Sequence, residues 1–294
     1  MSVTLAGALI GTLVDGSLLA LIGVGFVVIV RATRVVSFAQ GAFMVVGALI
    51  FYSLTASAGL GLIPGLICSC AAMGIIGALT YRVAFARVVG APALVSAMAT
   101  IGLGILGEAV AIMVWGTQAI VIPASTLHDN PLRIGGNFYI SPAGIVSIVL
   151  AIVITAALIA SLQFTKTGLR MRAVADHPRL AAFNGVNVVR MSTLAWAIAG
   201  VTAAAAGVAF TLGGQPSPDD VYSLGLIAFP AIILGGLDSI AGALVGGVLI
   251  AAVQQFTITY LGGQYEDLVC YGVLLIVLFV RPGGLFGRQE VARL

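Results

Sequence analysis

Two carboxylic acids, Asp15 and Glu108, stand inside long apolar stretches of this chain. A charged side chain that faces lipid is costly, so such residues usually point into a helix bundle or a wet cavity. Glu108 is therefore a candidate to line or gate a path for a polar solute, and Asp15 carries the same argument more weakly. The alternatives for Glu108 are a structural carboxyl bonded to a neighbouring helix, or one close enough to the membrane surface to be solvated.

Small and polar residues also interrupt the second apolar stretch, where Ser37, Gln40 and Gly41 stand just before Phe43. We expect these four residues to line the same path, with core packing as the alternative for the aromatic ring. Glycines inside apolar stretches either allow close helix packing or mark broken helices around a path.

Gly235 and Gly236 are further path candidates, because they stand where an apolar stretch breaks. Asp238, which follows them, is expected to cap the next helix.

Other chemistries find little support in the residue pattern. Cys68, Cys70 and Cys270 lie in apolar stretches, where free cysteine packs as a small hydrophobe, and His128 and His177 stand far apart, so no metal site is expected. The chain has no glycine-rich phosphate loop ending in Gly-Lys-Ser or Gly-Lys-Thr. Its apolar stretches also hold no cluster of nucleophiles or paired acids. We predict neither an enzyme nor an ATP site.

The elements that would position these side chains are membrane-spanning helices. Hydrophobic residues make up 61% of the chain and charged residues 8%, with a mean hydropathy of +1.18, whereas soluble domains carry about 25% charged residues. Apolar runs of about 20 residues suffice to cross a bilayer as helices, and they lack the alternation of a barrel. The runs are 9–30, 35–58, 60–81, 94–115, 143–164, 191–212 and 240–261, with shorter ones at 221–237 and 265–281.

We therefore predict an all-α, polytopic integral membrane protein with eight or nine transmembrane helices, some broken or re-entrant. Residues 1–294 would form a single transmembrane domain.

Basic residues predict how this domain is oriented. They cluster at 31–34, 82–87, 166–190 and 281–293, and all four clusters fall on one side if successive spans alternate. That side, with the C-terminus, is predicted to be cytoplasmic, and the polar segment at about 116–141 extracytoplasmic. Topology thus accounts for the net charge of +3, and no nucleic-acid partner is expected.

The basic loop, at about residues 165–190, reads TKTGLRMRAVADHPRLAAFNGVNVVR. Residues 169–183 are compatible with a helix apart from Pro178, and Gly185 would end it. Such a helix, rich in small residues, could lie along the membrane and fit a groove in a cytosolic partner. The alternative is a basic loop that only fixes topology.

At this loop the sequence resembles the permeases of the branched-chain amino-acid ABC transporter family. The residues that match the family's loop are Gly168, Leu169, Arg170, Arg172, Ala173, Ala175, Pro178, Ala181, Gly185, Val186 and Asn187. Other stretches match in the same order, namely Ser37–Ala48, Ala99–Ala109, Ala228–Gly247, Gln264–Val269 and Arg281–Arg288. The resemblance covers nearly the whole chain and is closest to the shorter of two homologous permease subunits.

The resemblance implies a type II ABC importer-like architecture in the bacterial cytoplasmic (inner) membrane, surrounded by lipid. The basic loop would be the coupling helix, and a bulky residue at Ala181 would uncouple transport from ATP hydrolysis. The implied partners are a second homologous permease, two cytosolic ATPase subunits that bind ATP and Mg²⁺, and an extracytoplasmic substrate-binding protein. No cofactor is implied for this chain.

The expected substrates are branched-chain or other small hydrophobic amino acids. Urea, amides and small carboxylates stay open, because the family often has His in place of Gln40 and Glu in place of Ala42. Two alternatives belong to other classes. One is a secondary transporter in which an ion gradient acts through Glu108 and Asp15, and the other is a membrane-embedded enzyme.

Overall fold

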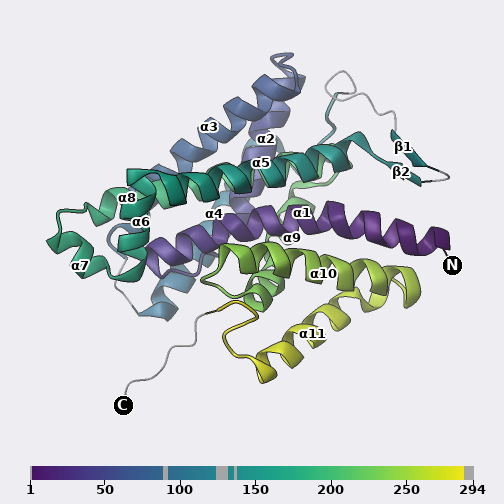
Figure 1. Cartoon of the computed structure of the whole chain (residues 1–294). Helices are drawn as coiled ribbons and strands as arrows, with labels where there is room; N and C mark the ends of the chain where they lie inside the picture. The colour runs from purple at the N-terminus through teal and green to yellow at the C-terminus, as the bar shows by residue number, and fades with distance from the viewer. Residues whose placement is uncertain (1, 89–91, 124–131, 136–137, 288–294) are drawn as a thin grey trace.

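The structure is a computed structural model, and it describes residues 2–88, 92–123, 132–135 and 138–287 of the chain. Long helices run alongside one another, with the N-terminus and two short strands at one end and two short helices, α6 and α7, at the other (Figure 1). The helices are α1 (Ser2–Thr33), α2 (Gln40–Ala56), α3 (Leu62–Thr80), α4 (Ala93–Trp115), α5 (Pro142–Phe164), α6 (Lys166–Asp176), α7 (Pro178–Phe183), α8 (Val188–Leu212), α9 (Pro218–Gly235), α10 (Ile240–Tyr260) and α11 (Glu266–Val280).

Three smaller elements complete the described chain. A π-helical turn, Tyr81–Phe85, extends α3, and a 3₁₀ turn, Gly263–Tyr265, precedes α11. The strands β1 (Leu132–Gly135) and β2 (Phe138–Ile140) pair antiparallel between α4 and α5.

The predicted fold class, an all-α polytopic membrane protein, is confirmed. Within the described residues, eight helical segments are long and apolar enough to cross a membrane, and α2, with 17 residues, is a shorter apolar helix. The strand pair is an addition to the predicted helices. His128, in the same segment of the chain, lies outside the described residues, as do residues 288–294 of the last basic cluster.

The core of the bundle is built around α1 and α8, which are mostly buried, whereas α4 and α11 are mostly exposed. A β-carbon at Gly200 of α8 would overlap the Met73 carbonyl of α3, and one at Gly207 would overlap the Met44 carbonyl of α2. Small residues therefore bring the backbone of α8 into contact with both neighbours. This is a common way to join helices in lipid, where burying apolar side chains provides no driving force.

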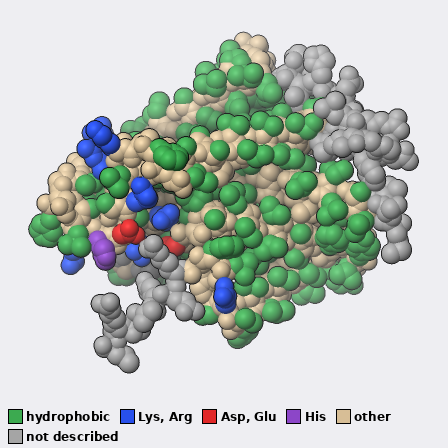
Figure 2. All heavy atoms as spheres, viewed as in Figure 1, with side chains coloured by type: hydrophobic (Ala, Val, Ile, Leu, Met, Phe, Trp, Pro, Cys, Tyr) green, Lys and Arg blue, Asp and Glu red, His purple; other side chains and the backbone are tan. Residues whose placement is uncertain are grey.

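Large apolar side chains cover the outside of α3, α4, α5 and α11. Figure 2 shows apolar side chains over most of the visible face, with Lys and Arg gathered toward one end. We call this the basic end; it carries Arg31, Arg34, α6 and α7. The flanks are thus suited to lipid or to other apolar helices, and the basic end to water.

Gly200→Ala tests the backbone contact between α3 and α8. The added methyl group overlaps the Met73 carbonyl unless a helix moves, and overpacking of this kind costs about 1–3 kcal/mol. The variant should melt at a lower temperature in detergent than Gly102→Ala, a site on α4 where an added β-carbon meets nothing within 4 Å. Equal melting temperatures would contradict this packing.

Candidate functional site

The chain turns back into the bundle between α1 and α2. Arg34, which follows the last residue of α1, has a positive φ of 58° and donates its N–H to the Val30 carbonyl (2.8 Å). Residues 34–39, the α1–α2 connection, then lead inward, since Gln40 at the start of α2 lies beside Gly25 of α1. Gly25 is about two helical turns, or roughly 12 Å, from the end of α1. α2 therefore begins inside the bundle.

Two neighbouring helices hold this connection. On α4, the Thr100 hydroxyl accepts a hydrogen bond from the Phe38 N–H (3.2 Å) and lies 3.1 Å from the Val36 carbonyl oxygen, to which it can donate. On α9, a β-carbon added at Gly41 would lie 2.6 Å from the Tyr222 carbonyl oxygen, so α2 starts in contact with that helix. Non-helical backbone at this depth needs protein partners, because lipid offers none.

Two buried polar atoms near the start of α2 have no hydrogen-bond partner. They are the Ser37 hydroxyl oxygen and the Gln40 amide oxygen, on side chains that are 1% and 2% exposed. The Gln40 amide nitrogen donates to the Ala199 carbonyl of α8 (3.4 Å), and no side chain caps the N-terminus of α2. A helix N-terminus carries free N–H groups and a partial positive charge. Buried polar groups are nearly always paired, so these atoms could be satisfied by a polar ligand.

A cavity of about 170 Å³ adjoins Ser37, and we call it the aromatic cavity. The Phe229 ring lies 5.0 Å from the Phe38 ring and 5.7 Å from the Phe26 ring, centroid to centroid. An apolar wall with a few polar groups is typical of sites for small molecules. The lining residues come from α1, the α1–α2 connection, α9 and α11: Phe26, Ser37, Phe38, Gly225, Leu226, Phe229, Pro230 and Tyr271.

Glu108 faces the first turns of α9 and does not line the aromatic cavity. Asp219 and Tyr222 of α9 are its neighbours. Because Tyr222 also contacts Gly41, these two acidic residues lie close to the start of α2. The role of Glu108 in a path stays a prediction.

Single residues set the ends of the helices in the basic loop. The Thr165 hydroxyl accepts a hydrogen bond from the Gly168 N–H (2.9 Å) and so caps α6. Gly168 also packs so closely on Leu162 that a β-carbon would overlap its backbone. His177 precedes a proline and therefore disfavours helical geometry, so α6 ends before it and α7 begins at Pro178. The helix predicted over 169–183 is therefore two helices, separated at His177.

The end of the loop is also determined locally. Gly185 has a φ of 77°, a conformation that favours glycine, and it ends α7. The side chain of Asn187 accepts a hydrogen bond from the Arg190 N–H (2.9 Å) and caps α8.

α6 and α7 bury one apolar face and expose another. Met171, Val174 and Ala181 are buried against the bundle, whereas Leu180 is exposed and Phe183 is 87% exposed. Exposed apolar side chains beside arginines are typical of a protein interaction site. The residues of the family motif that are exposed or partly exposed are Leu169, Arg170, Arg172, Ala173, Ala175, Pro178, Gly185, Val186 and Asn187.

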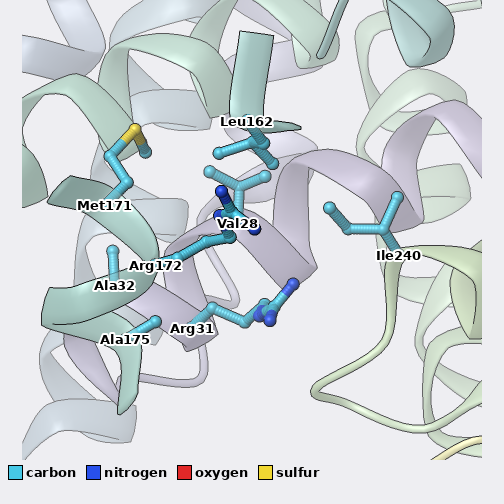
Figure 3. Close-up of a pocket in the computed structure, with 8 residues that line it drawn as sticks. All are labelled: Val28, Arg31, Ala32, Leu162, Met171, Arg172, Ala175 and Ile240. Atoms are coloured by element: carbon cyan, nitrogen blue, oxygen red, sulfur yellow. The ribbon is translucent and has the colours of Figure 1, made fainter. Parts of the chain in front are cut away.

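Arg34 joins the basic loop to the α1–α2 connection. Its guanidinium donates to the Ala175 carbonyl near the end of α6 (3.2 Å). Figure 3 shows α6 beside the end of α1, with Arg31 and Arg172 among the side chains that line a small pocket between them. Ser37 is the third residue after Arg34, so only a short piece of chain separates the contact with α6 from the aromatic cavity.

Comparison with known proteins identifies the family. Residues 8–278 match the family model for the branched-chain amino acid transport system / permease component. The chain belongs to this permease family. Its members are transport subunits and not enzymes, as the sequence predicted.

Several curated permeases are similar to the chain along nearly its whole length. The high-affinity branched-chain amino acid transport system permease protein LivH of Salmonella typhimurium is 28% identical, covering 95% of this chain and 94% of LivH. The corresponding protein BraD of Pseudomonas aeruginosa is 28% identical, with coverage of 97% and 96%. The probable branched-chain amino acid transport permease protein LivH of Methanocaldococcus jannaschii is 28% identical, with coverage of 94% and 91%. No solved structure matches the chain, so the type II importer-like architecture stays a prediction.

Three further predicted path residues of the permease lie away from the aromatic cavity, as Glu108 does. Phe43 packs against Trp196 in the core, with 6.4 Å between ring centroids. Gly235 and Gly236 lie at the turn between α9 and α10, where Gly236 has a φ of 105° and the Phe286 N–H donates to the Gly235 carbonyl (3.0 Å). These glycines allow close backbone packing at that turn. The structure thus brings Ser37, Gln40 and Gly41 together at the start of α2, where Ser37 lines the cavity, and it places the other four elsewhere.

The predicted cap of α10 is wrong by one residue. The Ser239 hydroxyl accepts a hydrogen bond from the Gly242 N–H (2.9 Å), while Asp238 is exposed in the turn before it. Serine and aspartate are equally good N-caps, so the sequence pattern does not decide between adjacent candidates.

Asp15 has a polar partner on another helix of the permease. The Gln255 side chain of α10 donates to its carboxylate, and Asp15 borders a recess of about 590 Å³ between α1, α5, α8 and α9. Its role in a path stays a prediction. The described residues contain no group of three or more His, Cys, Asp or Glu side chains that could hold a metal ion.

Sequence reasoning missed several residues that form the site. Phe26 and Phe229 offered no signal, because an aromatic residue in an apolar run has the pattern of ordinary packing. Pro230 offered one, since a proline inside a helix leaves the carbonyl four residues earlier without its N–H partner. Arg34 was noted only for its charge, although its position at a helix end made it a candidate C-terminal cap.

Arg34→Gly isolates the contact between Arg34 and α6 in the permease. Glycine adopts the positive φ freely, so the end of α1 should keep its geometry while α6 loses the hydrogen bond to Ala175. We expect faster amide hydrogen exchange in residues 166–176 than in the unmodified protein. Arg34→Ala should be less stable than Arg34→Gly by about 1 kcal/mol, because alanine, like arginine, is strained at positive φ. Unchanged exchange in Arg34→Gly would show that this contact does not hold α6.

Proposed function

We propose that this chain is a substrate-conducting permease subunit of an ATP-driven importer for branched-chain or other small hydrophobic amino acids. The observation that carries the proposal is the similarity from end to end to permeases named for branched-chain amino acid transport. The relatives cover at least 94% of the chain, so no large part of it is left over for another activity.

The basic loop supports coupling to a cytosolic ATPase. Leu180 and Phe183 project from α7 at the basic end, and Arg179 directly precedes Leu180 in sequence. Phenylalanine exposed to water is unfavourable unless a partner covers it. Ala181, by contrast, is 5% exposed and holds α7 against the bundle. The docking surface would therefore be the outer face of α6 and α7, with Ala181 acting behind it.

The remaining partners follow from the same proposal. The basic end faces the cytoplasm of a bacterial cell, where two ATPase subunits bind ATP and Mg²⁺. A second, homologous permease would cover part of the exposed apolar surface of the bundle, and lipid would cover the rest. A substrate-binding protein on the opposite side would supply most of the affinity, since the permease offers few polar groups inside the membrane.

Coupling would run from the docking surface to the path through Arg34. ATP binding would draw the two ATPases together and move α6, whose carbonyl at Ala175 is held by that side chain. The α1–α2 connection would then shift with Arg34. This route would explain why the basic loop lies next to the α1–α2 connection.

The proposed function predicts uptake that needs every subunit. Proteoliposomes that contain the complete transporter should accumulate leucine, isoleucine or valine only with ATP inside the cytoplasmic compartment and binding protein on the other side. Calorimetry on the binding protein identifies the ligand among amino acids, urea, amides and carboxylates. Uptake by this chain alone, driven by a proton or sodium gradient, would instead establish a secondary transporter.

Phe183→Asp tests the docking surface. A carboxylate in an apolar contact is costly to bury, so the ATPase subunits should no longer copurify with the permease and uptake should fall at least about tenfold. Phe183→Leu keeps an apolar contact and should retain most of the uptake. Because Phe183 is 87% exposed, neither variant should change the melting temperature of the permease alone. A complex that remains intact in Phe183→Asp would place the docking surface elsewhere.

A further inference from the structure

The aromatic cavity combines features that apolar packing does not require. Ser37 is among the residues around it; this residue is 1% exposed, and its hydroxyl oxygen is buried without a hydrogen-bond partner. A buried hydroxyl without a partner is unfavourable, so Ser37 is better explained by a ligand than by the fold.

A residue of the same wall carries a second polar group without its usual partner. Leu226 and Pro230 both line the cavity from α9, one helical turn apart. Pro230 has no N–H, so the Leu226 carbonyl lacks the donor that would normally satisfy it within the helix. The residues around the cavity thus include a hydroxyl without a partner, from the α1–α2 connection, and a carbonyl without its helical donor, from α9.

The apolar part of the wall fits a small hydrocarbon group. Phe26, Phe38 and Phe229 pack ring against ring along it. Its volume of about 170 Å³ is close to that of an apolar cavity of about 150 Å³ that holds a benzene molecule. An aliphatic side chain of three or four carbons fits such a space, whereas the ring of phenylalanine would fill it and leave less room for the charged groups of that amino acid.

We propose that the aromatic cavity is a transit site that holds the translocated amino acid by its apolar side chain and both of its charged groups. The ring wall takes the side chain, and Ser37 donates its hydroxyl proton to the carboxylate. The N-terminus of α2, which begins three residues after Ser37, adds a favourable field for that anion. The ammonium group donates to the Leu226 carbonyl and lies over the ring faces, which attract cations.

This inference rests on the proposed function and adds to it the place where selectivity within the membrane arises. Few polar groups and a small cavity make the site weak, which suits a step from which the substrate must leave. Arg34, at the other end of the α1–α2 connection, can move Ser37 and Phe38 away from α9 when α6 moves. The carboxylate and the side chain would then lose their contacts together.

Selectivity of transport tests the ring wall. The complete transporter in proteoliposomes is given equal concentrations of labelled valine and phenylalanine, and the ratio of their uptake is compared between variants with the same binding protein. Phe229→Ala widens the cavity, and Phe229→Leu widens it less. We expect the phenylalanine-to-valine ratio to rise at least about tenfold in Phe229→Ala, because a difference of a few methylene groups in a pocket has effects of this size.

Phe43→Leu is the matched control, since Phe43 is also buried but packs on Trp196 outside the cavity. It should leave the ratio unchanged. If Phe229→Ala does not assemble, a smaller rise of the ratio in Phe229→Leu supports the proposal, and an unchanged ratio in that variant overturns it.

Ser37→Ala tests the polar contact. Because the hydroxyl has no partner within the protein, its removal should not lower the melting temperature, yet uptake should fall about tenfold for all amino acids alike. Ser192→Ala, at a site of equal burial whose hydroxyl bonds to the Ala32 carbonyl, should transport as the unmodified protein does.

The outcomes separate the two proposals. If the unmodified transporter shows no ATP-dependent uptake of any amino acid, both the proposed function and the transit site are wrong. If it transports amino acids, but the ratio is unchanged in the Phe229 variants and Ser37→Ala transports normally, the transit site alone is wrong.

Discussion

A backbone polar group cannot be left without a partner in lipid, and the structure around the start of α2 depends on this constraint. Each unpaired N–H or carbonyl in hydrocarbon costs several kcal/mol, so a helix can begin at depth only where protein surrounds it. α1, α4, α8 and α9 provide that surrounding, through contacts that include Thr100 with the connection and Gln40 with Ala199. Because the break is enclosed, the Ser37 hydroxyl and the Gln40 amide oxygen are held away from lipid.

Arg34 determines why the basic loop lies beside the buried α1–α2 connection. Arg34 ends α1 in a left-handed conformation, which an L residue adopts at a cost of about 1–2 kcal/mol. A glycine would avoid this cost but could not reach the Ala175 carbonyl. One residue therefore closes a helix, turns the chain inward and holds α6, so that the basic loop and the buried connection form a continuous structure.

The long apolar runs made the helices predictable. Their ends agree with the structure to within a few residues for α3, α4, α5 and α10, because length and hydropathy suffice to define a span. Ser37, Gln40 and Gly41 lie together at the start of α2 because they are nearly adjacent in sequence, and their role in a path stays a prediction.

Long-range contacts were not predictable in the same way. Phe26, Phe38 and Phe229 meet only because three distant segments pack together, and no local pattern records that meeting. Gly235 and Gly236 show the reverse case, since a signal typical of a broken helix arises from a tight turn packed on the C-terminal segment. Pro178 indicated that the helix in the basic loop would break near His177. It did not indicate that a second helix would follow.

The alanine and glycine face of α8 has a consequence for how such a bundle can move. Helices in backbone contact have no long side chains between them that could change rotamer and absorb a displacement. α2, α3 and α8 are therefore expected to behave as one rigid body, and α9 is joined to α2 by the same kind of contact at Gly41 and Gly225, so large rearrangement falls to outer helices such as α11. The solute would then cross between helices that stay in place and helices that move.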